Sequence, residues 1–438
     1  KIKMIKNYSK SNFEAINSEL GSFLSIFLEN FHERSVQENW DMYSAAVANL
    51  ANKHIPVHAI TMNQDSPWFN AHLKRLSNKK KRLYRSAKKC GNEERWNAYK
   101  LASKNYVTAL KKAKSYYLQN VLPSMLTNDI KKFWRTIIPK PDDAVTLEDA
   151  SGNQIPFDLC ANVLNDVFSS HFSVDANDVL PNAEPFPHPV MPPICIDCSG
   201  VEAIIRSLRL SSAPGCDQID PKFLKSTCAS SSVILTMIFQ QSLDQGCLPA
   251  EWKIGKVTPF HKAGNRHSPL NYRPISLTSI PCKILEHILF SNLVKFLESN
   301  SFFTLAQHGF RKTYSCETQL ASFTHKLNVI LDHSFQADRI FLDFFKAFDK
   351  VSHSLLMHKL LQLNLDRKLL TWIEFFLNNR SQYVAANGVN SRHTAVQSGV
   401  PQGSVLGPLL FLIYFNDLPA CLSSHVHLFA DDCVIFRE

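Results

Sequence analysis

Apolar residues recur at helical spacing over much of the N-terminal third of the chain. The stretches Phe23–Phe31 and Trp40–Leu50 are amphipathic. From Leu73 the steps of three and four residues become regular, which predicts two long helices. The faces so defined consist of Leu73, Leu76, Lys80, Leu83, Ala87 and Cys90, then of Trp96, Tyr99, Ser103, Tyr106, Leu110, Ala113 and Tyr117. Because Gly91-Asn92 interrupts the pattern, we expect an antiparallel helical hairpin.

The C-terminal third mixes short apolar strands with apolar helices. Ile340–Phe344 is typical of a buried strand and carries Asp343 at its exit. Ser352 is the expected N-cap of the helix that follows, and Asp366 is expected to cap a further helix ending at Phe376. The first of these helices has an apolar stripe formed by Leu355, Leu356, Leu360 and Leu363.

Two β-hairpins are also expected in this part of the chain. Gln382–Ala386 and Ser391–Val396 flank Asn387-Gly388, the preferred two-residue turn. Val405–Phe415 is apolar and predicts a helix. Leu428–Phe436 approaches a tip from both sides with apolar residues, and only a tight turn can present neighbouring aspartates from such a hairpin.

The second hairpin supplies the first candidate chemistry. Its tip holds Asp431 and Asp432, and burying two like charges is costly unless a cation or hydrogen-bond donors compensate. Carboxylate oxygens suit Mg²⁺, although a surface Asp-Asp turn is the alternative for this hairpin alone. Asp343, 88 residues before Asp431, adds a third carboxylate. This set matches the needs of two-metal phosphoryl transfer, so we expect Asp343 and Asp431 to converge within about 4–6 Å.

Charge is distributed unevenly along the chain, whose formal net charge is +10. Positions 71–120 hold fifteen Lys or Arg and two Glu, a surplus of thirteen that exceeds the charge of the whole chain. A solvated helix face is the alternative interpretation, but such a face usually alternates its signs. Clustered cations bind nucleic acid by displacing counterions from phosphates. We therefore expect Lys79, Lys80, Lys81 and Arg82 to contact nucleic acid.

Positions 141–200 have the opposite character, with ten Asp or Glu and no Lys or Arg. Six of the thirteen residues in Pro181–Pro193 are proline, which predicts an extended linker, and Phe157–Phe172 could form one amphipathic helix before it. The acidity either repels nucleic acid or only solvates a spacer. We expect three parts: a basic helical region over 1–140, a linker over 141–200 and the domain with the aspartates over 201–438.

Cysteine usage and apolar run length restrict the cellular context. The eleven cysteines form an odd set, which favours reduced intracellular thiols over a disulfide framework. Cys195 and Cys198 lack a second pair for a zinc site, so we interpret them as structural. No secretory leader opens the chain, and Val405–Phe415 is too short to span a bilayer. We expect a protein of the cytoplasm and nucleus without membrane contact.

Several sequence blocks together resemble one family. Asp343 lies in Leu-Asp-Phe-Phe-Lys-Ala-Phe-Asp and Asp431 in Phe-Ala-Asp-Asp. These blocks resemble the reverse transcriptases of non-LTR (LINE-like, jockey-type) retrotransposons. Cys216 and Gln218 depart from the Lys-Ala-Pro-Gly-Pro-Asp-Gly turn of that family, which Ser211–Asp217 otherwise resembles. Four further blocks share the resemblance: Trp252–Lys262, Asn271–Leu277, Gln307–Arg311 and Ser398–Pro408.

The resemblance covers roughly residues 205–438 and implies an α+β fold. It implies the fingers and palm of a right-hand polymerase, with an antiparallel palm sheet of three or four strands backed by helices. We find no endonuclease, and the thumb would follow Glu438. The chain is therefore expected to be a fragment of an RNA-directed DNA polymerase that lacks both.

The resemblance also implies the ligands and the roles of single residues. Asp343, Asp431 and Asp432 would catalyse the reaction and bind two Mg²⁺ ions, for which Mn²⁺ can substitute. Arg311 would contact the template or only brace the fold. The partners would be an RNA template, a DNA primer or target, and deoxynucleoside triphosphates. The incoming nucleotide would contact Phe348, Gln402, Gly403, Lys262 and Arg273. Glycines beside Pro401-Gln402 would let the backbone approach this ligand.

Two alternatives remain beside this interpretation. RNA-dependent RNA polymerases share the palm, but their hairpin commonly contains Gly-Asp-Asp, and a carboxylate follows the first aspartate by five residues. Here that position is Phe348, whose ring would collide with a ribose 2′-hydroxyl. A catalytically inactive nucleic-acid-binding remnant is the other alternative, because Phe345 replaces a small polar residue. All of the proposed metal-binding aspartates are nevertheless present.

Overall fold

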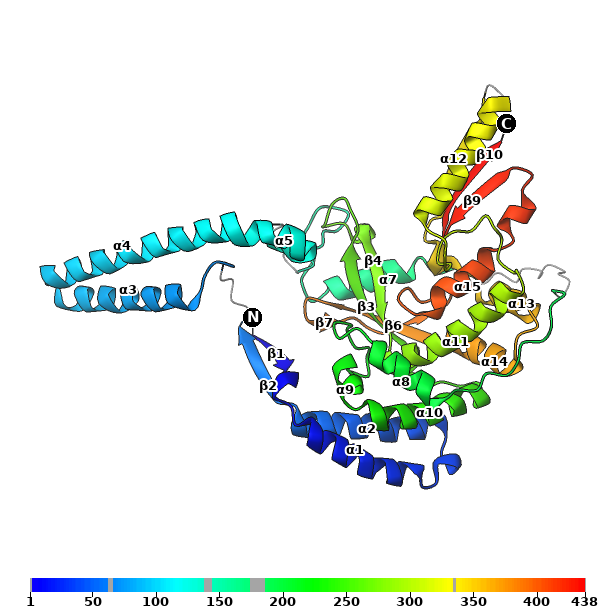
Figure 1. Ribbon diagram of the computed structural model, residues 1–438, viewed down its shortest axis with the longest axis horizontal. Coiled ribbons are helices and arrows are strands. Elements are labelled where there is room, and N and C mark those ends of the chain that lie inside the picture. Colours follow the sequence, from blue (N-terminus) through cyan, green and yellow to red (C-terminus); the bar gives the residue numbers. More distant parts are fainter. Residues whose placement is uncertain (1, 62–65, 138–143, 174–185, 334–335, 438) are drawn as a thin grey trace. The chain divides into compact units, whose positions relative to one another are not determined.

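The computed structural model describes residues 2–61, 66–137, 144–173, 186–333 and 336–437 (Figure 1). The chain packs as two units, Lys1–Ile5 with Val57–Asp143, and Lys6–Pro56 with Ala144–Glu438. This division differs from the three consecutive parts that composition suggested. The reason is that helices near the N-terminus and residues after 143 both pack into the second unit.

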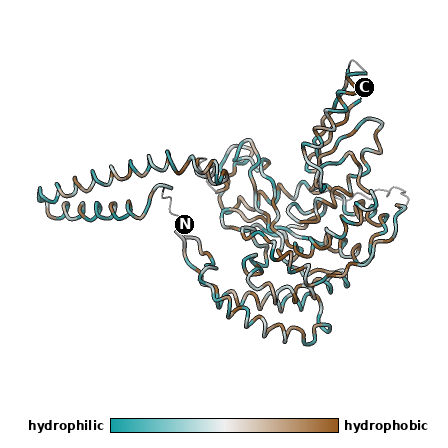
Figure 2. The backbone as a smooth tube through the Cα atoms, viewed as in Figure 1, coloured by the Kyte–Doolittle hydropathy of each residue, from teal (hydrophilic) through white to brown (hydrophobic). Residues whose placement is uncertain are grey.

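The first unit is mainly helical. The helices α3 (Ala71–Cys90) and α4 (Glu93–Tyr116) run antiparallel and pack against each other (Figure 1). Gly91 ends α3 in the left-handed conformation, with φ of 62°, which suits glycine. Hydrophilic residues dominate α3 (Figure 2). The other elements are β1 (Ile2–Lys6), β2 (Val57–Thr61), a π-helical segment (Tyr117–Val121), α5 (Leu122–Asn128) and α6 (Ile130–Ile137).

Helices from distant parts of the sequence form the main core of the second unit. Trp40 meets Trp252 edge-on, with ring centroids 5.0 Å apart. Ser352 and Asp366 cap their helices through side-chain oxygens, as predicted. Every helix in the described ranges is too short or too polar to cross a bilayer. The core helices are α1 (Phe13–Leu28), α2 (Val36–His54), α8 (Cys198–Ser207), α9 (Pro221–Ser226), α10 (Cys228–Gln245), α11 (Ile280–Ser299), α13 (His353–Leu361), α14 (Arg367–Leu377) and α15 (Leu406–Phe415).

A mixed five-stranded sheet has the order β4-β3-β6-β7, with β8 paired to β6. The predicted Asn-Gly hairpin is present. The strands β3 and β4 form a second hairpin, and β3 joins the two by pairing in parallel with β6. The helix α7 (Cys160–Ser169) packs against this sheet, so part of the expected linker is core. The strands are β3 (Ile254–His261), β4 (Tyr272–Leu277), β6 (Arg380–Ala386), β7 (Val389–Asn390) and β8 (Thr394–Val396).

A separate three-stranded antiparallel sheet has the order β5-β10-β9. Phe323 of the helix α12 (Cys316–His333) contacts the ring of Phe436, at 5.3 Å between centroids. The prediction that the first strand is buried was wrong, because Ile340 is 59% exposed and Phe341 69% exposed. The cause is that α12 packs on β9 at the opposite edge of the sheet and leaves the side chains of β5 largely uncovered. The three strands are β5 (Asp338–Asp343), β9 (His425–Phe429) and β10 (Asp432–Arg437).

Candidate functional site

Three carboxylates lie where β5 ends and β10 begins. Asp343 is the last residue of β5 and pairs directly with Asp432, the first residue of β10. Directly opposite residues of an antiparallel pair project from the same face, so these two side chains are neighbours. Asp431 precedes Asp432 in the turn after β9, next to Ala430. The predicted hairpin is therefore confirmed, with its two aspartates at the tip.

The three carboxylates interact electrostatically. Burial raises the pKa of Asp431, and the charges of Asp432 and Asp343 raise it further, whereas Arg273 lowers it. Clustered carboxylate oxygens are the donors that a hard divalent cation prefers, so the chemistry of this set fits Mg²⁺. Among the residues that the structure describes, no three His, Cys, Asp or Glu groups converge closely enough to enclose an ion. The hairpin thus brings the carboxylates into electrostatic contact without forming a closed cage.

A cavity of about 350 Å³ opens beside Asp431. This volume lies in the range of pockets that bind small molecules. Cationic, aromatic and amide groups converge in it from three elements that are far apart in sequence. They are Arg273 from β4, Lys346 and Phe348 from the segment after β5, and Gln402 and Gly403 from the loop before α15. The cavity therefore brings two cations, two aromatic rings and an amide together with two carboxylates, Asp431 and Asp349.

Asp343 and Asp432 line a different cavity, of about 590 Å³. Its other walls are largely apolar and include Phe323 and Phe341. Asp432 lies in β10 opposite Asp343, whereas Asp431 lies in the turn before it, and the two aspartates face different spaces. The hairpin tip therefore stands between the two cavities.

The ring of Phe348 is supported from behind while it lines the first cavity. It stacks on Phe411 of α15, with centroids 4.4 Å apart and an interplanar angle of 11°. Phe310 meets it edge-on at 6.1 Å. Phe348 is half-buried and packs against the main core. One side of the Phe348 ring therefore faces the cavity, and the other packs against the core.

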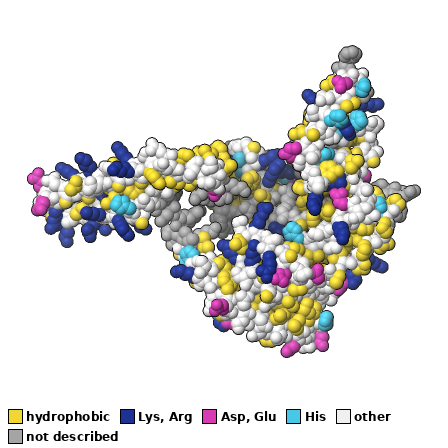
Figure 3. Space-filling view, in the orientation of Figure 1, with side chains coloured by type: hydrophobic (Ala, Val, Ile, Leu, Met, Phe, Trp, Pro, Cys, Tyr) yellow, Lys and Arg dark blue, Asp and Glu magenta, His cyan; other side chains and the backbone are white. Residues whose placement is uncertain are grey.

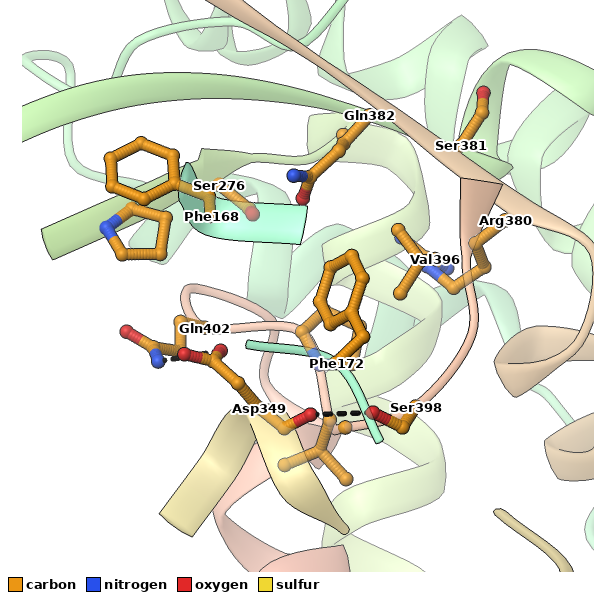
Figure 4. A pocket seen from close by; sticks show the side chains of 15 residues that line it. Phe168, Phe172, Ser276, Asp349, Arg380, Ser381, Gln382, Val396, Ser398 and Gln402 are labelled. Atoms are coloured by element: carbon orange, nitrogen blue, oxygen red, sulfur yellow. Dashed lines mark hydrogen bonds between the residues drawn. The ribbon is translucent and has the colours of Figure 1, made fainter. Parts of the chain in front are cut away.

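Gln402 is held by a buried carboxylate (Figure 4). Its Nε2 donates to Oδ1 of Asp349 at 2.9 Å, and its own amide oxygen points away from that carboxylate. The hydroxyl of Ser398 donates to the main-chain oxygen of Asp349 at 2.7 Å. Burial raises the pKa of Asp349 to about 6, although Lys346 and the Gln402 hydrogen bond lower it. Asp349 therefore fixes one end of the Gln402 amide.

The glycines around Gln402 serve the packing of the backbone. A Cβ added at Gly399 would lie 2.7 Å from the main-chain oxygen of Phe348, and one at Gly403 would lie 2.5 Å from that of Ser276. Both glycines have positive φ, at 87° and 112°. They let the loop approach β4 and the segment after β5, where a side chain would collide. The expectation that they also let a ligand approach the backbone stays a prediction, and Gly403 lines the cavity beside Asp431.

A buried glutamate fixes the start of α15. Glu286 of α11 accepts hydrogen bonds from the N–H groups of Val405, at 2.7 Å, and Leu406, at 3.0 Å. Burial raises the pKa of Glu286, whereas these two amides lower it. A carboxylate at a helix N-terminus satisfies free amides and complements the helix dipole. The loop that carries Gln402 is thus anchored at both ends.

Two of the predicted cationic contacts lie away from the first cavity. Lys262 is exposed in the loop between β3 and β4 and is not among the residues that line the cavity. Arg311 has a side chain that is only 7% exposed and pairs with Glu298 at 2.9 Å. Its guanidinium also donates to the main-chain oxygen of Thr304 at 3.0 Å and lies over the ring of Tyr314. The structure therefore favours the bracing role for Arg311 over a template contact.

The predicted basic residues lie on α3 in the other unit. Lys79, Lys81 and Arg82 are exposed, whereas the ammonium of Lys80 lies 4.8 Å from the ring centre of Tyr106. Lys and Arg side chains gather along α3 and α4 on the visible face, among polar and apolar groups (Figure 3). Three of the four residues are thus available to a polyanion, and the fourth packs between the helices.

Two residues at the site escaped the sequence interpretation. Asp349 ends a family-like motif, and nothing in its local sequence indicates that it is buried against Gln402. Gln307 lies in the same block as Arg311, and its side-chain oxygen accepts the N–H of Ala430 at 2.9 Å. The available signal was Gly309, because a Cβ there would lie 2.2 Å from the nitrogen of Ala430. An unusual glycine near a polar side chain can mark such a close approach.

Comparison with known proteins places these elements in context. Residues 260–438 match a family profile described as "Reverse transcriptase (RNA-dependent DNA polymerase)". Residues 69–131, which include α3 and α4, match one described as "Female sterile protein K10 C-terminal domain".

Curated relatives match about half of the chain. It is 32% identical over 248 residues to the probable RNA-directed DNA polymerase from transposon X-element of Drosophila melanogaster, covering 55% of this chain and 27% of that protein. It is 30% identical over 230 residues to the RNA-directed DNA polymerase from mobile element jockey of the same species, covering 52% and 25%. The chain spans about a quarter of the length of these relatives.

Proposed function

We propose that the chain is part of an RNA-directed DNA polymerase of a non-LTR retrotransposon, because residues 260–438 match the reverse transcriptase family profile and curated relatives of that kind match about half of the chain. It would copy an RNA template into DNA from deoxynucleoside triphosphates. The observation that carries this proposal is the cavity in which Asp431 faces Arg273, Phe348 and Gln402. In a nucleoside triphosphate, the phosphates would pair with the arginine, the sugar would pack on the aromatic ring, and polar groups would hydrogen-bond to the amide.

Each side chain then has a definite task. Asp343, Asp431 and Asp432 would hold Mg²⁺, which when bound activates the primer hydroxyl and stabilises the departing pyrophosphate. Arg273 and Lys346 would bind the triphosphate through charge-assisted hydrogen bonds. The ring of Phe348 would lie under the deoxyribose. Gln402, fixed by Asp349, would offer its free amide oxygen to a donor of the nucleotide.

The two sheets of the second unit correspond to two parts of a right hand. We assign the β3–β4 hairpin with its surrounding helices to the fingers. The β5-β10-β9 sheet, with α12 and α15, would be the palm. Lys262 would reach the triphosphate only through movement of the fingertip loop, since it is exposed outside the cavity. In the other unit, α3 and α4 would bind RNA or DNA through Lys79, Lys81 and Arg82.

A primer-extension assay tests the proposal. The protein receives an RNA template, a DNA primer, deoxynucleoside triphosphates and Mg²⁺. Asp431→Asn should lower kcat by more than about 100-fold. Loss of a residue that only supports a metal ligand already lowers activity by about 10–100-fold, and Asp431 would be a ligand itself. The matched control is Asp338→Asn at the exposed opposite end of β5, which should retain activity. Equal activity in both variants, or a preference of the wild type for ribonucleotides, would refute the assignment.

A further inference from the structure

Gln307 is a buried amide to which the chemistry above gives no task. Its side chain is 3% exposed, and both of its ends contact the turn before Asp431. Oε1 accepts the N–H of Ala430 at 2.9 Å and that of Gly309 at 2.7 Å. Nε2 donates to the main-chain oxygen of Ala430 at 3.2 Å. One side chain thus binds both polar groups of a single turn residue.

The turn that Gln307 binds has a strained backbone. Ala430 has φ of 56°, in the left-handed region that a residue with a Cβ rarely adopts. Ala430 immediately precedes Asp431, so its backbone angles set the direction in which the carboxylate leaves the turn. Backbone of this kind persists only where the surrounding structure holds it. The amide of Gln307 supplies that support through two hydrogen bonds to Ala430.

The main chain around Gln307 follows the hairpin closely. The N–H of His308 donates to the oxygen of Leu428 at 3.0 Å, and the N–H of Leu428 donates to the oxygen of Ala306 at 2.8 Å. Gly309 comes so near Ala430 that no side chain would fit there. The register of this segment on β9 therefore fixes where the Gln307 side chain can reach.

We propose that Gln307 is a positioning residue, which holds the Ala430 peptide and so aims the Asp431 carboxylate. The proposal rests on the polymerase function above, since that function gives Asp431 its task. Gln307 touches neither the carboxylates nor the cavity beside Asp431. A neutral amide is needed because the turn presents one donor and one acceptor. Ionised Glu would supply no donor, and Met would supply neither group.

The test compares Gln307→Met with Gln241→Met as a matched control. Gln241 of α10 also uses both ends of its amide, accepting from Asn39 at 2.9 Å and donating to the main-chain oxygen of Arg34 at 2.7 Å. It belongs to the helical core and does not contact the hairpin. Loss of an amide that donates and accepts hydrogen bonds is common to both variants, whereas loss of support for Ala430 is specific to Gln307→Met.

Hydrogen exchange gives a readout that does not depend on activity. Gln307→Met should speed exchange of the Ala430 amide about fivefold, the factor that corresponds to one net hydrogen bond. Gln241→Met should leave that amide unchanged. In Gln307→Glu the carboxylate still accepts the Ala430 N–H, so protection should be largely retained while the donor to the Ala430 oxygen is lost. Unchanged exchange in Gln307→Met would overturn the proposal.

Primer extension gives the second readout. Gln307→Met should lower kcat by about 10–100-fold, as loss of an outer partner of a metal ligand does, with KM for the nucleotide changed less than about twofold. Gln241→Met should lower the melting temperature and keep both constants. If kcat falls only as much as the folded fraction of the variant falls, the positioning role of Gln307 is refuted. If the wild type extends no primer, the polymerase proposal fails, and hydrogen exchange still decides whether Gln307 holds the turn.

Discussion

Replacing Asp349 by Asn should stabilise the protein at neutral pH. Asp349 is 8% exposed and accepts a hydrogen bond from Gln402. Burial raises the pKa of its carboxyl group from 3.8 to about 6, even though Lys346 and Gln402 act in the opposite direction. Asn has nearly the same volume and keeps an acceptor for Gln402, but it carries no charge. The substitution therefore removes a buried charge while it preserves the contact.

The pKa shift of Asp349 determines how the effect depends on pH. The unfolded chain releases this proton near pH 3.8, whereas the folded protein retains it up to about pH 6. Below pH 4 both states are protonated and the group costs no stability. Between about pH 4 and 6 the folded state binds more protons, so stability falls as pH rises, and above pH 6 the loss is complete. A pKa difference of this size corresponds to about 3 kcal/mol.

Thermal unfolding between about pH 4 and pH 8 measures this effect. Because the Asn amide N–H groups also require partners, we expect Asp349→Asn to gain about 1–3 kcal/mol at pH 8 and almost nothing at pH 4. The gain corresponds to about 2–4 °C in Tm per kcal/mol. Ser398→Ala is the control, because it removes a hydrogen bond to the Asp349 main chain and leaves the carboxyl group unchanged. A variant no more stable than the wild type at pH 8, or a gain independent of pH, would refute the reasoning.

Two further predictions concern the sugar and the nucleic acid. Phe348→Ala should admit ribonucleotides and keep deoxynucleotide incorporation, because it removes a ring from the cavity and leaves Asp431 intact. The ratio of kcat/KM for the two sugars measures this, and a variant that only unfolds would make Phe348 a core residue. Charge reversal at Lys79, Lys81 and Arg82 should weaken RNA binding and flatten its log–log salt dependence by about 0.7–0.9 per lost phosphate contact. A slope equal to that of the wild type would mean that these cations form only a solvated helix face.

Features that depend on residues close together in the chain were predictable from the sequence. Ser352 and Asp366 cap their helices through their own side chains. Asn387-Gly388 forms its turn with φ of 55° and 83°, which Asn and Gly tolerate better than other residues. The hairpin with Asp431 and Asp432 follows from apolar runs on both sides of a turn. In each case a local preference and the tertiary fold agree.

The candidate site was likewise predictable only where its residues lie in local motifs. Motif resemblance indicated Asp343, Asp431, Phe348 and Gln402, because each lies in a short block of characteristic residues. It could not indicate that Asp349 would bind Gln402, since 53 residues separate the two and only folding brings them together. The sequence also did not indicate that the side chains of β5 would be exposed. An apolar strand has the same sequence pattern whether or not another element covers it.

Tertiary structure alone decided which polar side chains serve the fold and which face the cavity. Arg311 and Arg273 are both arginines in family-like blocks, yet Glu298 and the Tyr314 ring engage the first, while the second lines the cavity. Gln307 contacts a turn 123 residues away, and its partners are main-chain groups that any sequence would offer. Local propensity and periodicity carry no information about such a contact. The hydrogen bonds form only after the hairpin and the segment before α12 have packed together.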